Sequence, residues 1–325
     1  AVNADLTDCF SQIQVPVEQQ PLLAFLWPKG DNPEETDTYL NTRHIFGATC
    51  SPAIANVAIR FTLESLPDSE WAKEVIRSFY MDDFFLSGDT EGEVTNQAKS
   101  VQGTLSESHF VLMKWMANSP KIISGWPEDE RAKEAKDIRI VDGDCAKLPV
   151  TKALGIIWDC DKDRFTVTSR QLQNEAAQRP KTLAKALSVL ASAFDPFGFM
   201  APYILKGKLL FQKMQQDHPK WDEPLDIARY PAWPKWVKGL PVLHKVALPR
   251  WTETVTGEKC RLAVFADASE YGYGAVAYLV TKNKSFLLMC KSRVVPKTQA
   301  KKKKQADLDK PEGLAGATIP RLELQ

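Results

Sequence analysis

Three aspartates in the first third of the chain have the residue type and setting of a catalytic carboxylate cluster. Asp82 and Asp83 are adjacent and have apolar residues on both sides, and Asp5 lies in an earlier strand-like segment with apolar flanks. If neighbouring strands bring Asp5 to the pair, the carboxylates repel one another unless cations hold them. Magnesium prefers oxygen ligands, and two such ions roughly 3.5–4 Å apart can activate an attacking hydroxyl and stabilise a leaving oxygen. The pattern therefore fits metal-assisted phosphoryl transfer.

The adjacent pair also has a simpler interpretation. Aspartate is a common turn residue, so Asp82 and Asp83 alone would only mark the tip of a hairpin. The additional acid, Asp5, favours the catalytic interpretation because a second strand could bring it to that tip.

Two further acids lie in the last quarter of the chain. Asp267 ends an apolar strand-like segment and precedes a glycine-rich stretch at 272–274, and Glu323 lies in the final segment, 318–325. Each of them, taken alone, is more simply explained as a surface acid. Their interpretation therefore depends on what precedes them in the chain.

The elements that must position these acids can be predicted from the spacing of apolar residues. The segments expected to form strands are 2–15, 21–27, a hairpin at 80–87, and 261–267, 274–281 and 285–293. The segments expected to form helices are 51–66, 92–108, 180–190 and 203–216. Proline, glycine and acidic residues predict a turn at 16–20 and a polar loop at 31–37.

Composition restricts the class of protein. The chain has 325 residues, 44% hydrophobic and 26% charged, which is an ordinary globular composition and allows two or three domains. It contains no run of eighteen apolar residues, so no membrane span is expected. The six cysteines are scattered, with no CxxC pair, which favours reduced intracellular thiols over disulfides or a zinc site.

Charge is distributed unevenly along the chain. Residues 1–100 contain 6 basic and 16 acidic side chains, whereas residues 170–250 contain 13 basic and 6 acidic ones. This asymmetry suits a metal site that precedes a polyanion-binding surface, although solvated faces of unrelated domains explain it equally well. The lysines best placed to follow a duplex backbone, on one expected helix, are Lys206, Lys208 and Lys213.

Three short motifs, taken in order, resemble those of reverse transcriptases. They are DLTDCF at 5–10, FGATCSP at 46–52 and YMDD at 80–83. The resemblance implies that Asp5 and Asp82 are the main metal ligands, with Asp83 auxiliary. It implies two Mg²⁺ ions as cofactors, with Mn²⁺ as an alternative. It also implies an RNA template, a DNA primer and deoxynucleotides as partners.

The same resemblance assigns roles to residues around the acids. Phe10 falls at the aromatic gate that excludes the ribose 2′-hydroxyl, although a core phenylalanine on an alternating strand is the simpler interpretation. Tyr80 and Met81 would lie beside the primer end and the incoming base. The residues that would line the nucleotide and template site are Gly47, Ser51 and Pro52. Phe46 stands where many retroviral relatives have glutamine, so that amide's role is not carried over.

Two later features extend the polymerase resemblance. Lys114, in the sequence LMKW, lies in the region where polymerases keep a lysine near the leaving pyrophosphate; a solvent-facing lysine is the simpler interpretation. The sequence LGIIW at 154–158 resembles the primer-grip hairpin, in which Leu154 and Gly155 would help to position the primer end. A buried strand with a tight glycine is compatible with that role.

The second half of the chain is similar to BEL/Pao LTR retrotransposons. The segments that carry this similarity are 185–202, 221–223 and 319–324. The segment 265–275 resembles the opening of RNase H domains. The resemblance implies that Asp267 and Glu323 bind metal in an incomplete RNase H site. We expect no cleavage of RNA in hybrids, because a complete site needs further acids downstream. The Lys301–Lys304 run departs from the family pattern like a loop insertion, and a solvated basic loop is its simpler interpretation.

The resemblance implies an α+β fold in three parts. These are a polymerase palm with part of the fingers at 1–148, the primer grip, helical thumb and connection at 149–255, and a truncated α/β RNase H-like domain at 256–325. The N-terminal fingers would be missing.

The implied function is that of an RNA-directed DNA polymerase (reverse transcriptase) within a retrotransposon polyprotein, the remainder of which would be a partner. It would serve transposition and DNA integration inside the cell, in cytoplasmic virus-like particles or in the nucleus. The main alternative is an inactive or co-opted remnant that binds nucleic acid or protein. A metal-dependent nuclease alone would leave the motifs before residue 120 unexplained.

Overall fold

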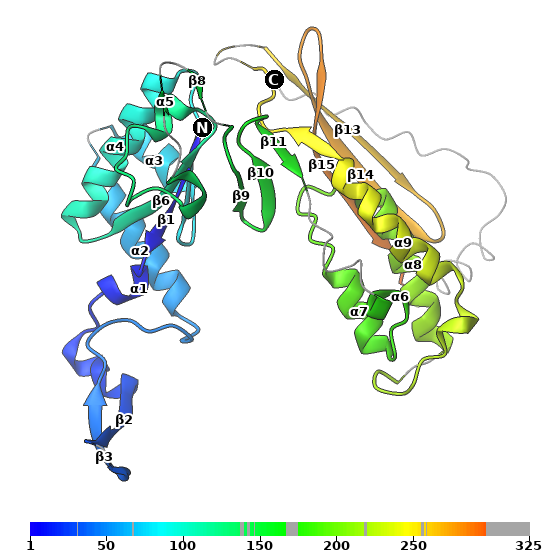
Figure 1. Cartoon of the computed structure of the whole chain (residues 1–325), viewed down its shortest axis with the longest axis horizontal. Coiled ribbons are helices and arrows are strands. Elements are labelled where there is room, and N and C mark those ends of the chain that lie inside the picture. Colours follow the sequence, from blue (N-terminus) through cyan, green and yellow to red (C-terminus); the bar gives the residue numbers. More distant parts are fainter. Residues whose placement is uncertain are drawn as a thin grey trace, which may run out of the picture. The chain divides into compact units, whose positions relative to one another are not determined.

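The structure is a computed structural model that describes residues 1–30, 32–66, 68–136, 140–141, 144–145, 147–166, 175–217, 220–254, 257 and 259–296 (Figure 1). The chain divides into two compact units, Ala1–Leu154 with Asp159–Lys162, and Gly155–Trp158 with Asp163–Gln325. Each unit has its own sheet and its own buried apolar residues.

A four-stranded sheet forms the centre of the first unit, in the order β4-β5-β1-β6. Its strands are β1 (Val2–Thr7), β4 (Phe79–Tyr80), β5 (Asp83–Leu86) and β6 (Val111–Ala117). β1 lies between β5 and β6 and is antiparallel to both. Its apolar side chains Val2, Ala4 and Leu6 are almost completely buried, as expected for alternate positions of a central strand. The hairpin predicted at 80–87 is confirmed by the pairing of β4 with β5.

Two helices of the first unit, α3 and α4, begin at side-chain caps. Asp68 accepts hydrogen bonds from two backbone amides at the start of α3, and Thr90 accepts one at the start of α4. α4 packs against β6 and α2. The elements are α1 (Cys9–Gln12), α2 (Ser51–Leu63), α3 (Ser69–Arg77), α4 (Glu91–Glu107), α5 (Pro120–Ile123), η1 (Val17–Leu23) and η2 (Lys133–Ala135), with short strands β7 (Ile140–Val141), β8 (Asp144–Cys145) and β9 (Val150–Ala153). The helices predicted at 51–66 and 92–108 are thus confirmed.

The strand predicted over 2–15 is wrong beyond Thr7. Asp8 has a φ of 50° in the left-handed region, which ends the extended conformation, and α1 begins at the next residue. Phe10 therefore lies on a helical turn and not on an alternating strand. The turn predicted at 16–20 is instead part of η1.

The polar loop predicted at 31–37 is also wrong. Residues Asn32–Leu40 form β3, which pairs with β2 (Ala24–Lys29) in an antiparallel hairpin. Gly30, with a φ of 58°, supplies the left-handed conformation that a tight hairpin connection needs. β2 is exposed along its whole length, so the hairpin does not need the apolar alternation by which a half-buried strand is recognised.

The second unit contains a helical core. Its helices are α6 (Glu175–Gln178), α7 (Leu183–Ala191), α8 (Ala201–Asp217) and α9 (Ala232–Gly239), with η4 (Ile227–Arg229) and η5 (Leu240–Lys245). Buried tryptophans join them. The indole of Trp233 donates a hydrogen bond to the Ala177 carbonyl and that of Trp236 to the Tyr203 carbonyl, each with a donor–acceptor distance of 3.0 Å. The helices predicted at 180–190 and 203–216 are confirmed. Among the short strands, β11 (Arg164–Thr166) lies between β10 (Ile156–Asp159) and β12 (Ala247–Pro249).

A three-stranded antiparallel sheet, β13-β14-β15, lies against α8 (Figure 1). The strands are β13 (Arg261–Ala268), β14 (Gly272–Val280) and β15 (Ser285–Val294), so all three predicted strands are confirmed. Gln212 of α8 donates to the Val295 carbonyl over 2.9 Å. Antiparallel sheets with segregated helices confirm the α+β class. Within the described residues, no helix has the length and apolar character that crossing a membrane requires.

Candidate active site

Strand pairing brings the three aspartates of the first unit together. In the β1–β5 ladder, Asp5 is directly opposite Asp83. The Leu6 amide donates to the Asp82 carbonyl over 2.7 Å, so the turn between β4 and β5 is fixed against β1. Met81 in this turn has a φ of 57°, an uncommon conformation for a residue other than glycine. All three acids therefore lie at the end of the β1–β5 ladder that adjoins the β4–β5 turn.

The carboxylates of this group influence one another electrostatically. Burial raises the pKa of Asp83, the charges of Asp82 and Asp5 raise it further, and only Lys114 opposes the change. Asp82 is exposed, whereas Asp5 and Asp83 are partly buried. Mutual repulsion of this kind is what a bound cation relieves.

Lys114 supplies a cation at this site. Its ammonium nitrogen lies 2.6 Å from Oδ2 of Asp5, across a sequence separation of 109 residues. The register between β1 and β6 shifts between Asn3 and Asp5, and Lys114 has a φ of 58° at this irregularity. The bulge explains how a strand residue turns its side chain toward Asp5.

The three carboxylates are oxygen donors of the kind that divalent cations bind. Three neighbouring carboxylates offer only oxygen ligands, which suits Mg²⁺ or Mn²⁺. Within the part of the chain that the structure describes, however, no three histidine, cysteine, aspartate or glutamate side chains converge as a ready metal site. The three residues therefore suit a divalent cation by their oxygen ligands and by their proximity to one another. Asp5, however, already pairs with the Lys114 ammonium.

Phe10, five residues after Asp5, forms an aromatic pair with Phe46. The rings of Phe10 and Phe46 meet edge to face, with centroids 4.7 Å apart and planes at 88°. Such geometry is a favourable aromatic contact. Phe46, which replaces the glutamine of many retroviral relatives, thus contacts the residue at the predicted gate. Sequence reasoning missed this contact, although two aromatic residues within separate motifs were a signal for it.

The loop that carries Phe46 and Gly47 is anchored at the start of α2. The buried Ser51 hydroxyl donates to the Ile45 carbonyl over 2.7 Å and lies 3.1 Å from Nδ1 of His44. Because the hydroxyl has one hydrogen, we assign Nδ1 of His44 as the donor to Ser51. Gly47, with a φ of 94°, takes a conformation that disfavours any side chain. Sequence reasoning did not single out His44.

Pro52 occupies the first turn of α2, a position where its missing amide costs no hydrogen bond. Tyr80 ends β4, and Met81 is the first residue of the turn that contains Asp82. Their side chains are 64% and 43% exposed, so both are open to a ligand beside the acids.

Leu154 and Gly155 are consecutive residues with positive φ, 49° and 78°, as in a tight hairpin turn. A Cβ on Gly155 would lie 2.7 Å from the Phe194 ring, so glycine is also needed there for packing. Leu154 ends the long segment of the first unit, and Gly155 belongs to the second unit.

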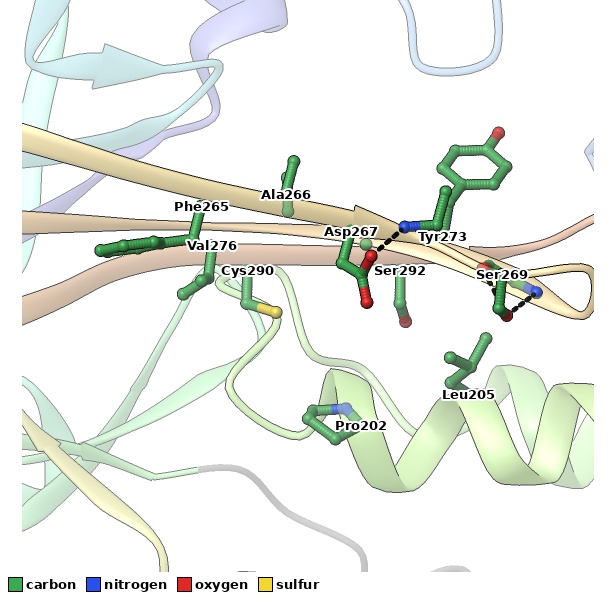
Figure 2. Close-up of a pocket in the computed structure, with 14 residues that line it drawn as sticks. Pro202, Leu205, Phe265, Ala266, Asp267, Ser269, Tyr273, Val276, Cys290 and Ser292 are labelled. Carbon is green, nitrogen blue, oxygen red and sulfur yellow. Dashed lines mark hydrogen bonds between the residues drawn. The ribbon is translucent and has the colours of Figure 1, made fainter. Parts of the chain in front are cut away.

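Asp267 occupies a separate site in the second unit. It is opposite Gly274 on β14, which is in turn opposite Ser292 on β15. Figure 2 shows the Asp267 carboxylate and Ser292 on the face of the sheet that is turned toward Pro202 and Leu205 of α8. These residues line a cavity of about 410 Å³. Glu323 and the Lys301–Lys304 run lie outside the described residues.

Comparison with known proteins agrees with this arrangement of two units. Residues 1–114 match the family model described as reverse transcriptase (RNA-dependent DNA polymerase), and residues 182–325 match that of the Pao retrotransposon-like RNaseH-like domain. No curated protein matches the chain.

Solved structures of similar fold include the foamy viral protease-reverse transcriptase in two complexes. The complex with RNA/DNA hybrid has a TM-score of 0.56 at 17% identity, over 92% of this chain and 34% of that one. The complex with dsDNA has a TM-score of 0.53 at 17% identity, over 95% of this chain and 54% of that one. This chain therefore spans about a third to a half of the length of these relatives, and at this identity the likeness shows the fold. With the two family matches in consecutive order, the chain carries a reverse transcriptase region followed by a Pao retrotransposon-like RNaseH-like domain.

Proposed function

We propose that this chain provides the catalytic palm of an RNA-directed DNA polymerase, which adds deoxynucleotides to the 3′-hydroxyl of a primer. The observation that carries the proposal is the pairing of β1 with β5, which sets Asp5 opposite Asp83 and beside Asp82 within the segment that matches reverse transcriptases. A group of carboxylates at the end of a hairpin, beside the exposed Tyr80 and Met81, could hold the metal ions that assist phosphoryl transfer.

In this proposal Asp5, Asp82 and Asp83 hold two Mg²⁺ ions, for which Mn²⁺ could substitute. When bound, the ions would neutralise charge that develops on the reacting phosphate. The chain's own contribution is positional. The bonds from β1 to the β4–β5 turn fix the three acids, so that little reorganisation is needed when a substrate binds.

The residues around the acids would shape the nucleotide and primer sites. Phe10, supported by Phe46, would form the wall against the sugar, with Gly47, Ser51 and Pro52 on the adjoining loop and helix start. Tyr80 and Met81 would contact the primer end and the incoming base. Leu154 and Gly155 would belong to the primer grip.

The proposed partners are an RNA template, a DNA primer, deoxynucleotides and the remainder of a retrotransposon polyprotein. The similar foamy viral structures hold RNA/DNA hybrid and dsDNA, which supports nucleic acid as the ligand class. Asp267, with Glu323, would contribute to an RNase H site on the second unit. Action in the cytoplasm, in a virus-like particle, or in the nucleus is part of the same proposal, as is the division at 148 and 255 into palm, thumb with connection, and RNase H-like parts.

Primer extension on an RNA template tests the polymerase proposal. We expect Asp82→Asn to abolish extension while duplex binding is retained, and Asp129→Asn, an exposed acid elsewhere in the first unit, to extend like the wild type. Equal extension by wild type and Asp82→Asn would refute the two-metal assignment. Duplex binding without extension by the wild type would favour the alternative of an inactive nucleic-acid-binding remnant.

A further inference from the structure

Lys114 and Asp5 form an ion pair across the β1–β6 ladder. The two side chains are 2.6 Å apart, and they are 65% and 27% exposed, respectively. Among the ion pairs of the described residues, only this pair contains one of the three proposed metal ligands. The ammonium therefore neutralises the charge of Asp5, which is also one of the proposed metal ligands.

The backbone holds Lys114 in this position. Leu112, Trp115 and Met116 are almost completely buried, so β6 is fixed on both sides of the lysine. Between them the strand bulges toward Asp5, and Lys114 takes its left-handed φ of 58°. A non-glycine residue in this conformation carries strain, and such strain is concentrated at functional sites.

The charges that face Lys114 all come from the proposed metal site. Its pKa is raised by the hydrogen bond to Asp5 first, against the effect of partial burial, and then by the charges of Asp5, Asp82 and Asp83. A divalent cation at the same carboxylates would meet this ammonium as a like charge and as a competitor for Oδ2 of Asp5.

We propose that Lys114 is a resident counter-cation of Asp5, which it must release when a divalent cation binds. This inference rests on the proposed role of Asp5 as a metal ligand. It accounts for the absence, within the described residues, of a convergent three-ligand group, because the lysine directs one of the three carboxylates toward itself.

The effect of this exchange on the affinity for the metal can be estimated. A solvent-exposed ion pair contributes little to stability, so Lys114 can leave without large cost. Removing its charge should therefore strengthen metal binding about two- to fivefold, the range that corresponds to such a pair. Arginine keeps the charge and can hold a carboxylate with two hydrogen bonds, so Lys114→Arg should not strengthen binding.

The experiment is a calorimetric titration of Mg²⁺, and in parallel of Mn²⁺, into the whole chain without nucleic acid or nucleotide. We expect Lys114→Met to lower the metal Kd two- to fivefold, Lys114→Arg to leave it unchanged or raise it, and Asp5→Asn to abolish the site. Lys121→Met is the matched control, because Lys121 is an exposed lysine of the same unit that pairs with Glu91; its Kd should equal that of the wild type.

An unchanged Kd in Lys114→Met, with binding still lost in Asp5→Asn, would overturn the exchange while the proposed metal site stands. Binding in Lys114→Met but not in the wild type would be the strongest support. If neither protein binds metal in a manner that depends on Asp5, both the exchange and the assignment of Asp5 as a ligand are wrong.

Discussion

The two candidate acid sites differ in how their strands are embedded. Asp5 is on β1, which has a neighbouring strand on either side, so one neighbour contributes Asp83 and the other contributes Lys114. Asp267 is on β13, which has one neighbour in the described sheet, and the residue opposite it is Gly274. A central strand thus gathers partners for an acid from both sides, whereas Asp267 depends on groups outside its own ladder.

The largest expected difference between the two sites is in polymerisation. Asp5→Asn should lower the rate of primer extension more than about 100-fold, because it removes a carboxylate proposed to hold the cations that would stabilise charge on the reacting phosphate. Asp267→Asn should leave extension unchanged. Single-nucleotide extension with both variants measures this, and a similar loss in both would mean that the sites do not act separately.

The packing beneath Asp267 can be broken without touching the Asp5 site. A Cβ on Gly198 would lie 1.5 Å from the Cys290 carbonyl oxygen, and Gly198 has a φ of 75°. We expect Gly198→Ala to destabilise the contact between the segment before α8 and β15 by about 3 kcal/mol or more, from steric overlap and backbone strain together. Amide hydrogen exchange in peptides that cover α8 and β15 reports this loss.

Gly257→Ala is the matched control for that substitution. Gly257 also has a positive φ, 88°, but nothing lies within 4 Å of a Cβ there, so only about 1 kcal/mol of strain is expected. Equal losses in the two variants would show that backbone conformation, and not the close approach to Cys290, makes Gly198 necessary.

A third carboxylate, Asp163, differs from Asp5 and Asp267 because an arginine holds it. Arg250 donates two hydrogen bonds to it, over 2.6 and 2.8 Å, and the Trp158 indole donates a third. Burial raises the pKa of Asp163, but these hydrogen bonds and the arginine charge lower it below its usual value. Its stabilising contribution is therefore complete above the unfolded pKa of about 3.9 and is lost as the pH falls through the lower folded pKa.

We expect Arg250→Met to lower the free energy of unfolding by about 2 kcal/mol at neutral pH, since a half-buried carboxylate loses its partner. The deficit should shrink as the pH falls below the unfolded pKa of about 3.9, and it should be smallest below the lower pKa that Asp163 has in the folded wild type, where the carboxyl is protonated in both folded proteins. Urea unfolding between pH 3 and pH 7 measures it, with Arg250→Lys as an intermediate case. A deficit that does not change with pH would mean that Arg250 acts through packing alone.

The sequence predicted the features that local patterns encode. Apolar alternation located β13, β14 and β15, and helical spacing located α2, α4 and α8. The prediction failed at β3 because a strand that is exposed along its length can be largely polar and then lacks apolar alternation. The contact of Lys114 with Asp5 could not be predicted, since it depends on a register shift between strands 109 residues apart in sequence.

The smallest expected effect concerns the aromatic pair beside the acids of the first unit. Phe10 is partly buried and Phe46 is 69% exposed. The change in unfolding free energy for either alanine variant alone therefore combines the loss of burial with the loss of the ring contact. A double-mutant cycle of Phe10→Ala and Phe46→Ala separates them. We expect a coupling free energy of about 0.5–1.5 kcal/mol in urea unfolding, the usual worth of an edge-to-face pair.

Phe61 provides the control for this cycle, because it is an exposed phenylalanine of α2 in the same unit and the structure shows no ring contact between it and Phe10. Phe61→Ala combined with Phe10→Ala should therefore be additive. Additivity for Phe46 as well would mean that it does not support Phe10, and the proposed wall against the sugar would then consist of Phe10 alone. A measured coupling would instead make the loop anchored at Ser51 part of that wall.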